Sequence, residues 1–179
     1  VDLHGFFIVG STSVPDAALL EAALTVAKMI SKRPDFLQTL INEGVHLTVL
    51  GRTEKATQVP EYAYLASDGS YNWDATRGLG ATRTTPVSSC AEENLLCYGA
   101  GLDTYDGETI CVHETAHSLQ GSGCSLPTRR YAEQGSSGLS TTLTALCTTA
   151  MSANRWANTY AGSNYQEMWA EGVQAFYGV

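Results

Sequence analysis

His113-Glu114-Thr115-Ala116-His117 forms an H-E-x-x-H motif, the strongest structural signal in the chain. On an α-helix, side chains four residues apart lie on one face, with Cβ atoms about 5–6 Å apart. Two imidazoles at this spacing can bind one zinc ion, with Zn–N distances of about 2.0–2.1 Å. Glu114 lies about 100° further round the helix, where a carboxylate can take a proton from bound water. We therefore predict that His113 and His117 bind zinc and that Glu114 is the general base.

A second segment supplies candidates for the third zinc ligand. A catalytic zinc usually has three protein ligands and leaves the fourth position to water. Residues 165–177 have the pattern of an amphipathic helix, on which Glu167 and Glu171 are four residues apart and point the same way. Two carboxylates beside apolar residues need a cationic partner. We predict Glu167 as the ligand; Glu171, or one of Glu92 and Glu93, stays open as the alternative.

The two segments together resemble the gluzincin metallopeptidases. Within that group, Tyr160, Glu167 and Glu171 stand as in the anthrax lethal factor catalytic domain and the Pro-Pro endopeptidases, where a tyrosine precedes the ligand glutamate by seven positions and a second glutamate follows it by four. The resemblance implies one Zn²⁺ per chain, bound by His113, His117 and Glu167. It implies that Tyr160 donates a hydrogen bond to the transition state and that Glu171 orients a ligand histidine, His113. The motifs cover only residues 110–120 and 160–176.

These motifs favour one function over two others. We expect a secreted zinc metalloendopeptidase that hydrolyses peptide bonds with water activated by zinc and Glu114. One alternative is a disulfide-stapled binding or effector module with a non-catalytic zinc site. The other is a zinc amidase that acts on a non-protein substrate, because the sequence assigns no specificity pocket.

Composition limits the domain organisation and the partners. At 179 residues the chain is long enough for one domain, residues 1–179, with a substantial core. The formal net charge of −8, with three lysines, argues against nucleic acid and anionic membranes as partners. No apolar run is long enough to span a bilayer. We expect a monomer that binds a peptide or protein substrate.

Five cysteines are many for a cytosolic enzyme of this size, and none forms a C-x-x-C pair. Together with the Ser/Thr/Gly-rich composition they indicate secretion and two disulfides. The pairs that we expect are Cys90–Cys97 and Cys124–Cys147. Cys111 is then a free thiol that faces away from the metal, although sequence alone leaves the pairing open.

The order of the remaining patterns predicts an α+β fold. We expect strands at 5–10 and 45–50, strand-like pieces near 62–65 and 86–98, and helices at about 15–31, 34–44, 140–156 and 165–177. The expected architecture is zincin-like: a small sheet packed against helices, with the H-E-x-x-H helix, a C-terminal Glu-bearing helix and the active-site cleft between the sheet edge and that helix.

Overall fold

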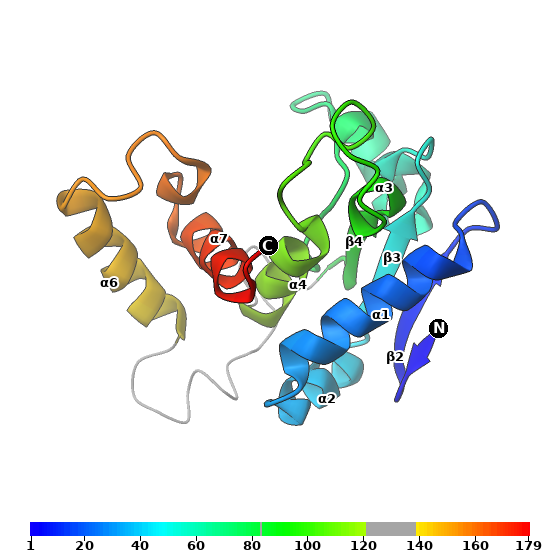
Figure 1. Cartoon of the computed structure of the whole chain (residues 1–179), viewed down its shortest axis with the longest axis horizontal. Helices are drawn as coiled ribbons and strands as arrows, with labels where there is room; N and C mark the ends of the chain where they lie inside the picture. Colours follow the sequence, from blue (N-terminus) through cyan, green and yellow to red (C-terminus); the bar gives the residue numbers. More distant parts are fainter. Residues whose placement is uncertain (83, 121–138) are drawn as a thin grey trace.

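A four-stranded sheet forms one side of the molecule. The computed structural model of the chain describes residues 1–82, 84–120 and 139–179 (Figure 1). The strands lie in the order β1-β2-β3-β4; β1 is antiparallel to β2, and the other pairs are parallel. Their bounds are β1 Asp2–Leu3, β2 Phe6–Gly10, β3 His46–Leu50 and β4 Val87–Ala91. The strands predicted at 5–10 and 45–50 are thus confirmed as β2 and β3.

The sheet is covered on both faces, and β4 shows how. Side chains alternate along a strand, so Cys90 joins a core with the helices while Val87 and Ala91 join a second core with 3₁₀ turns. Helices α1 (Asp16–Ile30) and α2 (Pro34–Asn42) cover the first face. The short helices η1 (Ala56–Gln58), η2 (Pro60–Ser67) and η3 (Trp73–Ala75) lie over the second.

The strand-like interpretation of residues 62–65 is wrong, because this segment lies in the 3₁₀ helix η2. Pro60 stands in its first turn, where a missing N–H costs nothing. Tyr62 and Leu65 are buried, and a spacing of three residues places both on one side of a 3₁₀ helix. The Tyr62 hydroxyl donates to the backbone oxygen of Val87 at 2.9 Å, which fixes the turn to the sheet.

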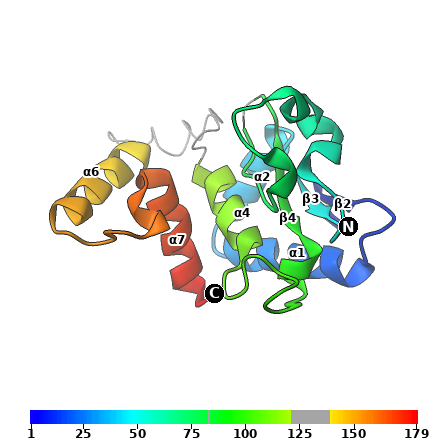
Figure 2. The ribbon, with the colours of Figure 1, turned by 90° about the horizontal axis from the view of Figure 1, so that it is seen from above.

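The predicted motif helix is α4 (Ile110–Gln120), and it occupies the middle of the fold. Figure 2 shows α4 between the sheet and α7 (Tyr165–Tyr177), with α6 (Leu139–Ser152) beyond α7. A short helix, α3 (Glu92–Leu95), follows β4, so the strand-like pattern at 86–98 is only half correct. Sheet and helices together confirm the predicted α+β class.

The predicted disulfide between Cys90 and Cys97 is not formed. Both residues are free thiols. Cys90 is fully buried on β4, where its side chain is hydrogen-bonded to that of Cys111 on α4, whereas Cys97 is exposed. The two side chains therefore point to different environments, although the chain between them is short. Cys111 is a free thiol packed in the core, as predicted. Cys147 is also a buried free thiol, so the predicted Cys124–Cys147 disulfide is not formed either; Cys124 itself lies outside the described residues.

Within the described ranges, no helix is both long enough and apolar enough to cross a bilayer.

Candidate metal centre

Asn94 positions the start of the motif helix. Its side-chain oxygen accepts a hydrogen bond from the backbone N–H of Ile110 at 2.8 Å, satisfying a donor that the first turn leaves unpaired. The Asn94 amide nitrogen donates to Asp103 at 2.9 Å and to the backbone oxygen of Glu108 at 2.7 Å. A buried side chain thus fixes both the helix and the loop that precedes it.

Asn164 positions the Glu-bearing helix in the same way. Its Oδ1 accepts from the backbone N–H groups of Gln166 and Glu167, both at 2.9 Å, which is the preferred cap for a helix N-terminus. Gly178 ends the helix in the left-handed region, with φ of 73°, a conformation that glycine adopts without strain. Glu167 therefore lies in the first turn of α7, at the end that is capped.

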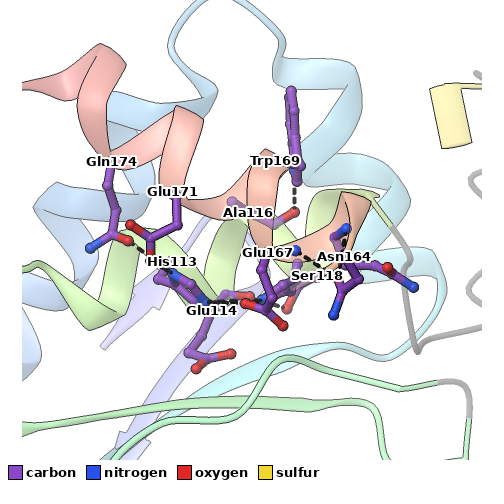
Figure 3. Close-up of polar contacts among 11 residues, drawn as sticks. His113, Glu114, Ala116, Ser118, Asn164, Glu167, Trp169, Glu171 and Gln174 are labelled. Carbon is purple, nitrogen blue, oxygen red and sulfur yellow. Dashed lines mark hydrogen bonds and ion pairs between the residues drawn. The ribbon is translucent and has the colours of Figure 1, made fainter. Parts of the chain in front are cut away.

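Three side chains from α4 and α7 meet at one point. The Nε2 atoms of His113 and His117 are 3.0 Å apart. Oε2 of Glu167 is 3.1 Å from Nε2 of His113 and 3.3 Å from Nε2 of His117. Figure 3 shows the side chains of Glu167 and His113 near each other. Among the described residues, His113, His117 and Glu167 form the one group of His, Cys, Asp or Glu side chains whose ligand atoms lie close enough together to hold one metal ion.

The electrostatics of this group favour a bound cation. Burial would lower the pKa of His113, but hydrogen bonding to Glu167 and the charge of Glu114 raise it from 6.5 to about 9. Burial would likewise raise the pKa of Glu167, but hydrogen bonds with both histidines lower it from 4.5 to about 2. The carboxylate is therefore ionised at neutral pH and keeps a positive charge on the imidazole beside it. A metal ion can replace that proton.

The donor set fits zinc. Two imidazole nitrogens and one carboxylate oxygen are the ligands of many catalytic zinc sites. All three residues line the cleft described below, so a fourth coordination position can face that cleft. Facing Nε2 atoms 3.0 Å apart need a proton or a cation between them, because two bare lone pairs at this distance repel each other.

Glu114 is on α4 beside this group, and its side chain faces the segment 78–82. Burial raises the pKa of Glu114, while the charges of His113 and His117 and a hydrogen bond from the Gly80 backbone N–H oppose the shift. The segment can approach so closely because it has glycines here. A Cβ at Gly78 would lie 2.4 Å from Ile110 Cγ2, and one at Gly80 would lie 2.7 Å from His117 Cβ.

Tyr160 lies on the open side of the group. It begins the short helix η4 (Tyr160–Gly162), is 62% exposed, and its ring stacks near His113 with centroids 6.2 Å apart. Burial against the protein and the charges of Glu167 and Glu114 raise its pKa to about 12, so the hydroxyl keeps its proton at neutral pH. Tyr160 can therefore donate a hydrogen bond into the open position.

A cleft of about 480 Å³ passes over these residues. One wall comes from the segment around η3 and the glycines, and the other from α7 and the residues before it, so the cleft lies between the sheet edge and the Glu-bearing helix. Its aromatic walls include Tyr71 and Trp73. The lining residues are Tyr71, Trp73, Thr76, Gly78, Leu79, Gly80, Thr82, Tyr105, His113, Glu114, His117, Tyr160, Asn164, Gln166 and Glu167.

Two side chains of α7 approach the other nitrogen of His113. Oε1 of Glu171 is 3.5 Å from Nδ1, and Oε1 of Gln174 is 2.8 Å from the same atom (Figure 3). Glu171 thus lies on the side of the ring away from His117, which disfavours the alternative that makes it the zinc ligand. The sequence interpretation missed Gln174, although it stands seven residues after Glu167 and three after Glu171, on the same helix face.

The remaining alternative ligands have other positions. Glu93 is buried and forms a two-pronged ion pair with Arg77, with Nε–Oε1 and Nη2–Oε2 distances of 2.6 and 2.9 Å. Arg77 also donates to the backbone oxygens of Glu54 and Gly51. Glu92 belongs to no candidate metal group within the described residues. Glu93 therefore stabilises the loop around Gly51 and Arg77.

Comparison with solved structures identifies a protein of the same fold. A Pro-Pro endopeptidase from Paenibacillus alvei superposes with a TM-score of 0.60 and 17% sequence identity, over 92% of this chain and 80% of the other. No family model and no curated protein sequence matches the chain. The structural likeness shows that the chain has the zincin-like α+β fold that its motifs predict.

Proposed function

We propose that the protein is a zinc-dependent metalloendopeptidase. The observation that carries this proposal is the convergence of His113, His117 and Glu167 beside the Glu114 carboxylate. The peptidase fold of the structural neighbour is consistent with it. One zinc ion, held by the two Nε2 atoms and Oε2, would supply Lewis-acid activation of a water molecule and of the scissile carbonyl.

Glu114 is the general base in this proposal. Its raised pKa suits a group that takes a proton from water and passes it to the leaving amine, because proton transfer is most effective when the catalytic pKa lies near the working pH. The Gly80 N–H donates to the same carboxylate and holds it beside the histidines. A Glu114→Gln variant should keep the metal ligands and lose the proton transfer.

Tyr160 is the donor to the developing oxyanion. Its hydroxyl stays protonated at neutral pH and lies on the cleft side of His113. A neutral donor placed where negative charge develops contributes roughly 10²–10³ in rate. Its position outside the group of metal ligands leaves the hydroxyl free to approach a substrate carbonyl.

A peptide is the substrate class that the cleft favours. The cleft is lined by the aromatic rings of Tyr71 and Trp73 and contains the carboxylates of Glu114 and Glu167. An extended peptide can lie across such a cleft with its carbonyl at the metal. Secretion is also part of the proposal; it rests on composition alone.

Metal content is the first test. Wild type should contain about one zinc per chain, and Glu167→Ala should lose it, because the variant removes one of three ligands. Glu43→Ala, which replaces an exposed glutamate outside the cleft, is the matched control and should keep the metal. Wild type and Glu114→Gln should then be compared on a peptide library, with zinc content measured in parallel.

The outcomes separate the possible functions. Zinc in both proteins with cleavage by wild type alone supports the metallopeptidase. Zinc without any peptide cleavage favours a non-catalytic site, or an amidase if non-protein amides are hydrolysed. Wild type that binds no zinc, even after incubation with the metal, contradicts the proposal.

A further inference from the structure

We propose that Gln174 is the principal positioning residue for the ligand histidine His113. This inference rests on the proposed zinc site and adds a residue to it. The Gln174 side chain reaches from the C-terminal half of α7 to Nδ1 of His113 (Figure 3). His117 and Glu167 approach the other ring nitrogen, Nε2. Gln174 does not line the cleft.

The geometry fixes which atom of the amide faces the ring. If Nε2 of His113 binds a metal, its lone pair is used there and the ring hydrogen must be on Nδ1. The partner of Nδ1 must then be an acceptor, which is the Oε1 of Gln174 at 2.8 Å. A metal-binding histidine commonly donates its second ring N–H in this way, which fixes the tautomer and the direction of the lone pair.

Gln174 makes this contact better than Glu171 does. The Glu171 oxygen is 3.5 Å from Nδ1, beyond the usual range for a hydrogen bond, whereas the Gln174 oxygen lies within it. Glu171 is also partly exposed, with a quarter of its side chain accessible, while Gln174 is 3% exposed. A buried hydrogen bond has less competition from water, so it holds the ring more firmly.

The other end of the amide supports a specific role for the oxygen. Nε2 of Gln174 is buried and has no hydrogen-bond partner among the described residues. A buried unpaired N–H costs stability, about 1–3 kcal/mol for such groups in general. An apolar side chain of similar length would avoid that cost. The glutamine instead provides an oxygen that accepts a hydrogen bond from Nδ1 of His113.

Three variants test the assignment through zinc affinity, measured by competition with a chelator at about pH 7.5. Gln174→Met keeps the length of the side chain and removes the acceptor; it should weaken zinc binding by about 10–100-fold. Gln174→Glu keeps an oxygen in the same place and should bind zinc as tightly as wild type or more tightly. Glu171→Gln should weaken binding less than Gln174→Met does.

Thermal unfolding of the metal-free proteins separates positioning from general destabilisation. Gln174→Met should melt near wild type, because the lost hydrogen bond and the lost unpaired N–H offset each other. Equal zinc affinity in wild type and Gln174→Met would overturn the inference. The inference would also be overturned if Gln174→Met and Gln174→Glu lost zinc affinity equally, or if Glu171→Gln lost more zinc affinity than Gln174→Met.

These results are distinct from a failure of the proposed function. A wild type that binds zinc but cleaves no peptide overturns the peptidase and leaves the role of Gln174 intact. Matching affinities in wild type and Gln174→Met overturn only the role of Gln174.

Discussion

The indole N–H of Trp169 donates a hydrogen bond of 2.9 Å to the backbone oxygen of Ala116, and this bond joins α7 to α4, the two helices of the candidate metal centre. Ala116 lies immediately before the proposed ligand His117, and Trp169 follows the proposed ligand Glu167 by two residues. The bond therefore fixes the distance between the two helices within one turn of the ligands (Figure 3). The hydrogen bond involves neither ligand side chain, so a mutation can remove it without changing the ligands.

We expect Trp169→Phe to destabilise the protein by about 1 kcal/mol and to weaken zinc binding, because a ring without the N–H loses the hydrogen bond that joins the two helices. Chemical unfolding and chelator competition measure the two effects. Trp156→Phe, at a site 42% exposed, is the control. Unchanged zinc affinity in Trp169→Phe would mean that the helices hold their spacing without this bond.

Tyr160→Phe should lower kcat on a cleaved peptide by about 10²–10³ and leave zinc content and melting temperature unchanged. The hydroxyl is near the open side of the metal group but is not one of its three ligand atoms. Tyr98→Phe, at a site 38% exposed and outside the cleft lining, is the control. Full activity in Tyr160→Phe would remove Tyr160 from the mechanism.

Stability and zinc affinity should respond to pH in opposite directions. In the metal-free protein the pKa of His113 is raised from 6.5 to about 9, so its contribution to stability is complete below pH 6.5 and is lost as pH rises through 9. Zinc binding needs the neutral ring, so affinity should rise about tenfold per pH unit below 9. Melting curves of the metal-free protein and chelator competition from pH 6.5 to 9 measure both. A zinc affinity that is constant across this range would show that His113 is already neutral.

Gly78→Ala should destabilise the protein by roughly 1–3 kcal/mol, because its methyl group would overlap Ile110 Cγ2 and press on Glu114. Activity should fall with it, since the segment that carries Gly80 must move away from the Glu114 carboxylate. Gly69→Ala, where the added methyl meets no atom within 4 Å, is the matched control. Equal stability of the two variants would mean that the segment shifts without cost.

Glu93→Gln should cost about 3–5 kcal/mol of stability and leave zinc bound, because it removes one partner of the buried pair with Arg77. Lys55→Met breaks the exposed pair with Asp74 and should cost no more than about 1 kcal/mol. Unfolding by denaturant compares the two. Loss of zinc from a folded Glu93→Gln protein would restore Glu93 as a candidate ligand.

Relations within one helix could be predicted from the sequence. The spacing of His113 and His117, and that of Glu167 and Glu171, follow from the helical repeat, so the residues alone were enough to predict the motif helix and the Glu-bearing helix. The α+β class followed from the order of helical and strand-like patterns along the chain. The helical repeat also places Gln174 on the face of Glu167, but nothing in the sequence distinguishes it from a buried amide with another partner.

The sequence by itself determined which side chains share a helix face, because local backbone geometry repeats regularly. Only the tertiary structure decided how the faces meet: that Glu167 approaches Nε2 of His113 while Gln174 approaches Nδ1, and that Cys90 lies against Cys111 instead of Cys97. These contacts join segments far apart in the chain. They depend on how α4 packs between the sheet and α7, which no local pattern encodes.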